Sequence, residues 1–166
     1  MKTERKHWKI KLNEISKPER INFSMQFTDE QFEKITNGLI PEEMEDKWFI
    51  YFEDNWLYFH RSWTGYCQFK IRITKEKDEK QYCVKEFYAE RNYDRYKCIV
   101  DSEDIRKIQL LITRGLLGIA EKKIDTDFNS NSTVELISNW SDFGMLLFND
   151  TTDSEKRDQF LFISKQ

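Results

Sequence analysis

The chain has 166 residues, enough for one domain with a substantial core and few for two, so we expect a single domain over residues 1–166. Its 27 basic and 30 acidic residues nearly balance, which argues against nucleic acid as a partner, because nucleic-acid-binding domains usually carry a basic excess. The sequence contains no apolar stretch of the roughly 18 residues that span a membrane, and no signal-peptide core, so we expect a cytoplasmic protein without a membrane partner.

The first third of the chain predicts short strands and one helix. Residues 8–12 and 21–27 are predicted strands, and in the second of them apolar and polar residues alternate. A helix is predicted over residues 28–37, because Thr28 and Gln31 match a capping box and Gly38 follows as a stop signal.

The centre of the chain predicts four consecutive antiparallel strands. Residues 47–53 and 56–62 form a predicted hairpin, joined at Asp54 and Asn55, which tolerate the positive φ angles of a type I′ turn. Both faces of these strands are apolar, so they should lie centrally or line a pocket. Residues 67–74 alternate and predict one solvated face, and a fourth strand follows over residues 81–89.

A second, longer helix is predicted over residues 102–123, with acidic residues in its first turn and an apolar stripe along one side. Residues 134–137, 145–148 and 159–164 are weaker strand candidates. The expected fold is therefore α+β: a single antiparallel sheet of five to seven strands, with one long helix packed on it and one short helix.

The candidate binding site lies in residues 43–69, where polar groups and indole rings gather near strand ends. We expect Arg61, Ser62 and Thr64 to bind an anion, since a guanidinium pairs with phosphate and hydroxyls add donors. Trp48 and Trp63 could stack on a base, and Glu45 and Asp46 could accept hydrogen bonds from ribose hydroxyls. In the alternative interpretation, Arg61 pairs with these acids, the indoles fill the core and Gly65 only makes a turn.

The sequence favours neither a metal site nor catalysis by a nucleophile. The chain has two histidines and three widely spaced cysteines without a CxxC pair, so we expect free thiols, no metal and no cofactor. His60 and Ser62 lie two apart on one strand and are not expected in hydrogen-bond contact. No catalytic residue is therefore assigned.

Aromatic and basic residues alternate in the segment that follows, which is one sign of a single-stranded nucleic-acid platform. The residues are Tyr82, Phe87, Tyr88, Tyr93 and Tyr96 with Lys85, Arg91, Arg95 and Lys97. The same alternation is ordinary for a twisted strand that runs into a loop.

The sequence words MEDKWF at 44–49 and LYFHRSWTG at 57–65 resemble an uncharacterised domain family of bacteria and phages. Members of that family sometimes lie beside macro-type domains, which handle ADP-ribose. The resemblance covers residues 43–72 and implies an ADP-ribose or nucleotide-like ligand. It implies no catalytic residue, and it assigns the ligand to Glu45, Asp46, Trp48, Arg61, Ser62, Trp63 and Thr64.

The expected function is a non-catalytic intracellular protein that binds a phosphate-bearing nucleotide derivative of the ADP-ribose or cyclic-nucleotide type. Such a protein could sequester or sense a signal in conflict between bacteria and phages. One alternative is a protein-interaction module with a protein partner, such as an inhibitor or immunity protein. The other is a hydrolase of the same ligand class that uses Glu43, Glu45 or Asp46 as acid or base.

Overall fold

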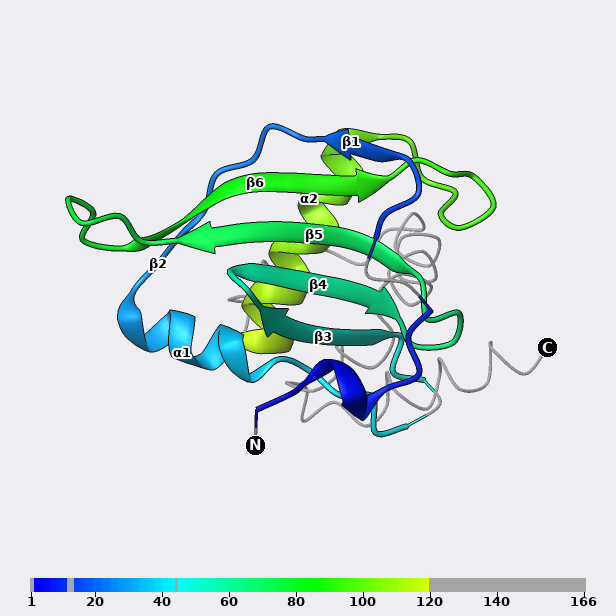
Figure 1. The fold of residues 1–166 in the computed structure, drawn as a ribbon, viewed down its shortest axis with the longest axis horizontal. Coiled ribbons are helices and arrows are strands. Elements are labelled where there is room, and N and C mark those ends of the chain that lie inside the picture. The colour runs from blue at the N-terminus through cyan, green and yellow to red at the C-terminus, as the bar shows by residue number, and fades with distance from the viewer. Residues whose placement is uncertain (1, 12–13, 44, 120–166) are drawn as a thin grey trace, which may run out of the picture.

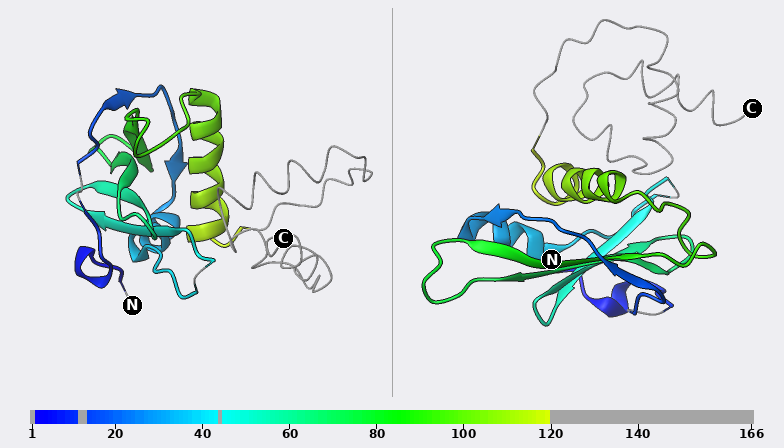
Figure 2. Two further views of the ribbon diagram at one scale, coloured as in Figure 1. Left: turned by 90° about the vertical axis from the view of Figure 1, so that its right-hand side faces the viewer. Right: turned by 90° about the horizontal axis from the view of Figure 1, so that it is seen from above.

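The computed structural model describes residues 2–11, 14–43 and 45–119. A six-stranded antiparallel sheet carries helix α2 on one face, and the amino-terminal 3-10 helix η1 lies on the opposite side (Figures 1 and 2). The elements in chain order are η1 Arg5–His7, β1 Pro18–Arg20, β2 Gln26–Phe27, α1 Asp29–Asn37, β3 Trp48–Glu53, β4 Trp56–Arg61, β5 Cys67–Thr74, β6 Tyr82–Glu90, α2 Asp101–Leu110 and the π-helix η2 Leu111–Leu116.

The sheet confirms the predicted single antiparallel arrangement. Its order is β1-β6-β5-β4-β3, with β2 also paired to β6, so the four strands β3 to β6 are neighbours in sequence and in space. None of the helices among the described residues has the length and apolar character needed to cross a membrane.

Local capping and turn signals act as predicted. The Thr28 side chain accepts a hydrogen bond from the Gln31 backbone N at 3.2 Å, and the Gln31 side chain accepts one from the Thr28 N at 3.0 Å. Helix α1 ends at Gly38, whose φ is +71°. Asp54 and Asn55 have φ angles of +49° and +67°, the pair of positive values that a type I′ hairpin turn requires.

Strand β3 is an edge strand, yet both of its faces are covered. Its edge is partly paired by Leu39, which exchanges two backbone hydrogen bonds with Ile50 at 2.8 and 2.9 Å. Trp48 and Ile50 join the core under α2, while Phe49 and Tyr51 on the opposite face are fully buried. The predicted two-sided burial is therefore present, and the second face is covered by the amino-terminal segment instead of by a further strand.

Of the two strands predicted near the amino terminus, the first is wrong and the second is confirmed only in part. No strand forms among the described residues of the predicted segment 8–12, which bends at Trp8 and Lys11 after η1. The predicted strand 21–27 is present only as β2, and a separate short strand, β1, precedes it. Between β1 and β2, two backbone hydrogen bonds of 2.9 Å connect the chain to β6. The Ile21 N–H donates to Phe87 O, and the Val84 N–H donates to Met25 O.

The prediction of one long helix is also wrong. Helix α2 has ten residues and passes into the six-residue π-helix η2. The π-helix η2 ends before Gly118, because the φ of that residue is +63° and cannot continue a right-handed helix. The Leu117 N–H closes the last turn by donating to Ile112 O at 2.9 Å. The predicted end of this helix at 120–123 and the strands at 134–137, 145–148 and 159–164 lie outside the described residues.

A buried polar network fixes the start of α2 against the end of β6. The fully buried Asp104 carboxylate pairs with Arg91 at 2.7 Å and accepts a hydrogen bond from the Tyr96 hydroxyl. The Lys107 ammonium donates to the same hydroxyl at 3.0 Å. Burial and the neighbouring Asp104 raise the pKa of Tyr96, so the hydroxyl keeps its proton and acts as a donor.

We expect Asp104→Asn to lower the free energy of unfolding by about 3 kcal/mol, because it removes the buried carboxylate of the network and leaves the Arg91 guanidinium with only the exposed partners Glu19 and Asp101. Glu103→Gln, one position earlier on the exposed side of α2, should change it by less than about 0.5 kcal/mol. Urea denaturation of both variants measures the two values. Equal losses would contradict the assigned role of the network.

Candidate functional site

Asp46, one of the two acidic residues of the predicted site, forms hydrogen bonds within the loop before β3. The Asp46 carboxylate accepts hydrogen bonds from the backbone N–H groups of Glu42 and Glu43, at 2.9 and 3.2 Å. Glu45 is partly exposed beside it. Asp46 therefore holds residues 42–46 in shape through one of its two carboxylate oxygens, Oδ2.

Ser62, Trp48 and Arg61 are also engaged within the chain. The buried Ser62 hydroxyl donates to the Asp46 backbone oxygen at 2.7 Å. Trp48 is 1% exposed and stacks on Phe69 with ring centres 5.8 Å apart, so its faces are not open to a base. The Arg61 guanidinium lies 5.1 Å from the centre of the Trp48 ring, a cation–π contact.

Trp63 and Thr64 are the members of the predicted site that face solvent. Trp63 is 71% exposed, and the Lys47 ammonium lies 5.8 Å from the centre of its ring. The Thr64 hydroxyl accepts a long 3.4 Å hydrogen bond from Tyr66 N. The seven predicted residues thus form a structured turn with one exposed indole, and the structure does not bring their polar groups together around an open space.

The turn over residues 61–65 instead receives the amino-terminal segment. The Trp8 indole N–H donates to Ser62 O at 2.9 Å, and the Lys11 N–H donates to Gly65 O at 3.0 Å. Gly65 has φ +72°, and a Cβ atom there would lie 2.7 Å from Lys9 O. The Trp8 ring also stacks on Phe49, with ring centres 6.2 Å apart, and covers the second face of β3.

We expect Gly65→Ala to detach the amino-terminal segment and to lower the free energy of unfolding by about 2–4 kcal/mol, from the strained φ and the clash with Lys9 O. Gly118→Ala is the matched control, since its φ is +63° but no atom lies within 4 Å of the added Cβ. It should cost only about 1 kcal/mol. Hydrogen exchange at the Lys11 amide should quicken in the first variant alone; similar values for both variants would contradict the docking role.

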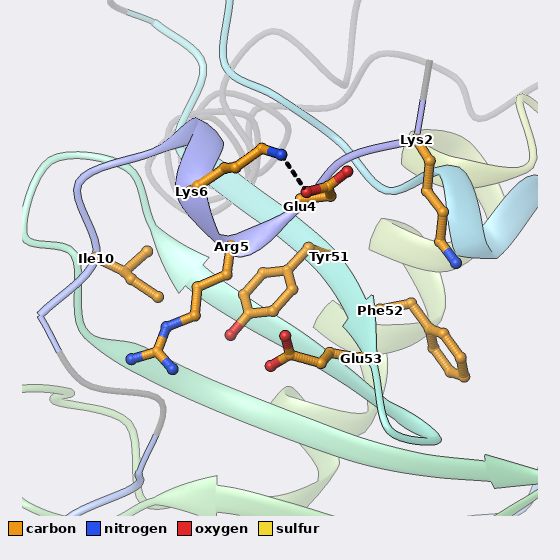
Figure 3. A pocket seen from close by; sticks show the side chains of 8 residues that line it. All are labelled: Lys2, Glu4, Arg5, Lys6, Ile10, Tyr51, Phe52 and Glu53. Carbon is orange, nitrogen blue, oxygen red and sulfur yellow. Dashed lines mark ion pairs between the residues drawn. The ribbon is translucent and has the colours of Figure 1, made fainter.

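A pocket of about 680 Å³ opens between this segment and β3 (Figure 3). Its lining residues are Lys2, Glu4, Arg5, Lys6 and Ile10 from the segment and Tyr51, Phe52 and Glu53 from β3 and its end. Three cations, two acids and the Tyr51 ring therefore lie around one space, whereas the Phe52 ring packs edge-on against Phe32 on the other face of β3. This mixture suits a polar ligand that carries an anionic group.

The cations of the pocket differ in their partners. Lys6 pairs with Glu4 at 2.7 Å and lowers the pKa of that carboxyl. Among the described residues, Lys2 and Arg5 make neither a hydrogen bond nor an ion pair. The Arg5 guanidinium, the Tyr51 hydroxyl and the Glu53 carboxylate face the same space in Figure 3.

The Tyr51 hydroxyl is buried and has no hydrogen-bond partner within the described part of the chain. Burial, with the nearby Glu53 charge, raises the pKa of Tyr51, so the group remains a neutral donor and acceptor. A buried hydroxyl without a partner costs about 1–3 kcal/mol. Such a group needs either a water or a ligand atom.

His60 lies behind Tyr51 on the same face, with ring centres 5.8 Å apart. Its Nδ1 is 3.0 Å from Gly65 O, and because a carbonyl only accepts, Nδ1 carries the proton. Nε2 then holds a buried lone pair with no partner among the described residues. Burial lowers the pKa of His60 to about 4, so the ring is neutral in the folded protein.

We expect the folded state to lose stability as pH falls below about 6.5, the ordinary histidine pKa. The unfolded chain gains a proton on His60 there, whereas the folded chain resists it down to a pKa of about 4. Urea denaturation between pH 7 and pH 5 measures the slope. His60→Gln should flatten the slope, and replacing the other histidine, His7→Gln, should not; the reverse result would contradict this assignment.

The pocket residues Lys2, Arg5, Tyr51 and Glu53 were not among the predicted site residues. The one signal in the sequence was the apolar character of both faces of β3, which predicted that the strand lies centrally or lines a pocket and did not name an opposite wall. Among the described residues, no group of three or more His, Cys, Asp or Glu side chains is placed to hold a metal ion.

Comparisons with protein-family models, with curated proteins and with solved structures found no match. The resemblance noted for residues 43–72 therefore stays a prediction.

Proposed function

We propose that the chain is a non-catalytic cytoplasmic protein that binds a phosphate-bearing nucleotide derivative, of the ADP-ribose or cyclic-nucleotide type, in the pocket between η1 and β3. It would sequester or sense that compound. This proposal assigns the ligand to the pocket between η1 and β3, and no longer to the turn at 61–65, which helps to hold the wall of that pocket.

The charges of the pocket support a ligand with one anionic end. Arg5 and Lys2 lack carboxylate partners among the described residues, and a guanidinium pairs well with phosphate oxygens. Glu53 on the opposite wall can accept from ribose hydroxyls or amino groups, as carboxylates commonly do in nucleotide sites.

The Tyr51 hydroxyl is the observation that carries the proposal. It is buried, it lacks a partner among the described residues, and it lies beside an arginine that has no ion pair there. A phosphate or ribose oxygen would supply its missing hydrogen bond once a small shift of the side chains over the hydroxyl lets the ligand reach it. A group kept at a cost to stability is typical of a binding site.

Tyr51→Phe should therefore separate stability from binding. Removal of the unpaired hydroxyl should leave the free energy of unfolding unchanged or raise it by about 1 kcal/mol. The same change should weaken ADP-ribose binding about tenfold or more, because it removes a hydrogen bond to a charged group. Arg5→Ala should weaken binding at least as much. Isothermal titration calorimetry and urea denaturation give the two quantities.

Tyr93→Phe is the control, since it removes a hydroxyl from a side chain that is 63% exposed and outside the pocket. It should change neither quantity. Mass spectrometry after each titration should recover intact ADP-ribose, whereas its conversion would favour the hydrolase alternative. If ADP-ribose, AMP and cyclic AMP all fail to bind the unaltered protein, the proposal fails.

A protein-interaction module is a second candidate, favoured by exposed apolar side chains in the loop between β6 and α2. Ile99 is 72% exposed and Val100 50% exposed, close in sequence to Tyr93. Such a loop suits a protein partner more than a polar small molecule. A stoichiometric complex lost in Ile99→Asp but kept in Arg5→Ala would favour this candidate.

A further inference from the structure

A row of aromatic and basic side chains crosses the sheet and ends at the pocket. The strand register makes direct cross-strand partners of Arg20 and Tyr88, Tyr88 and Lys70, Lys70 and Tyr58, and Tyr58 and Tyr51. Paired residues in neighbouring strands point to the same face. The five residues therefore form one line across β1, β6, β5, β4 and β3.

This row lies on the face of the sheet opposite α2, the face toward the viewer in Figure 1. Arg20 is exposed, Tyr88, Lys70 and Tyr58 are partly exposed, and Tyr51 is buried under the amino-terminal segment. The rings of Tyr58 and Tyr51 stack with centres 5.1 Å apart, so the row is continuous with the pocket wall.

The cations of the row lack acidic partners. The Lys70 ammonium lies 4.8 Å from the centre of the Trp56 ring and 5.7 Å from that of Tyr88, and no carboxylate pairs with it among the described residues. The same holds for Arg20. Glu86, which neighbours the row, pairs with Arg72 at 2.7 Å and accepts a hydrogen bond from the Tyr88 hydroxyl at 3.0 Å, and its charge also attracts Arg20 without forming an ion pair.

We propose that this face binds a single-stranded oligonucleotide, with bases on Tyr88 and Tyr58, a backbone phosphate at Lys70 between them, and the terminal phosphate in the pocket at Arg5. Adjacent strands lie about 4.8 Å apart, so two rings two strands apart are separated by roughly 10 Å with the cation between them. Rings that stack on bases and cations that follow phosphates are the usual means of single-strand binding.

This inference rests on the proposed function, because the row ends in the same pocket. It also qualifies the expectation drawn from composition, which argued against nucleic acid from a net charge of −3. Net charge describes the whole chain, whereas binding depends on the local surface, and here Arg20, Lys70 and Arg5 lack acidic partners within the described residues.

The test is fluorescence anisotropy with a labelled, 5′-phosphorylated six-nucleotide single-stranded RNA, in competition with unlabelled AMP and a dinucleotide, at two salt concentrations. Affinity should rise from AMP to dinucleotide to hexanucleotide and fall with added salt. Tyr88→Ala should weaken hexanucleotide binding about 5- to 100-fold and leave AMP binding unchanged. Lys70→Gln should weaken it and reduce the salt slope by about one.

Lys70→Arg keeps the positive charge and should retain affinity for the hexanucleotide. The matched control for the loss of a charge is Lys77→Gln, at an exposed position in the connection between β5 and β6. The inference is overturned if AMP binds through Arg5 but a longer oligonucleotide binds no more tightly, or if the variants of the row bind as Lys77→Gln does. In either case the proposed function stands, and a protein becomes the partner to seek for this face. Failure of AMP and oligonucleotides alike would overturn both.

Discussion

The close approach between Gly65 and residues 9–11 is the contact on which the functional part of this structure depends. A glycine is required there, because its φ is positive and a Cβ atom would lie 2.7 Å from Lys9 O. Together with the hydrogen bond from Trp8 to Ser62 O, this approach ties the amino-terminal segment to the end of the β4 strand. Without it the pocket would have no outer wall and the second face of β3 would be bare.

Two-sided burial of an edge strand has a chemical consequence. Phe49 and Tyr51 are covered on the face away from α2, and their large rings contribute strongly to burial. The same cover takes the Tyr51 hydroxyl and His60 Nε2 out of water without giving either a partner in the described residues. The segment that stabilises the sheet therefore also creates the polar cavity that we assign to a ligand.

Local signals in the sequence were reliable where the structure is decided by neighbours in the chain. The capping box of Thr28 and Gln31 and the turn at Asp54 and Asn55 both formed as predicted. The predicted strand 21–27 failed because pairing with β6 is interrupted between its ends, which only the tertiary partner determines. The predicted long helix failed because its apolar stripe continues past Gly118, whereas the positive φ of that residue ends the helix.

The candidate site was harder to predict for a physical reason. The polar residues at 45–64 were correctly placed near strand ends, but their groups serve the turn and loop, since Asp46 and Ser62 find partners in the backbone nearby. Arg5 and Tyr51 are separated by the whole first third of the chain, and no local pattern joins them. The row from Arg20 to Tyr51 likewise exists only once the register of five strands is known.

The central claim is that the pocket at Arg5, and not the turn at Arg61, holds the phosphate of the ligand. NMR spectra of the arginine side-chain Nε–Hε groups during titration with ADP-ribose distinguish the two positions directly. The account predicts a saturable shift of the Arg5 signal with the Arg61 signal unchanged. A shift of Arg61 and of the Trp63 indole N–H, with Arg5 unchanged, would contradict it.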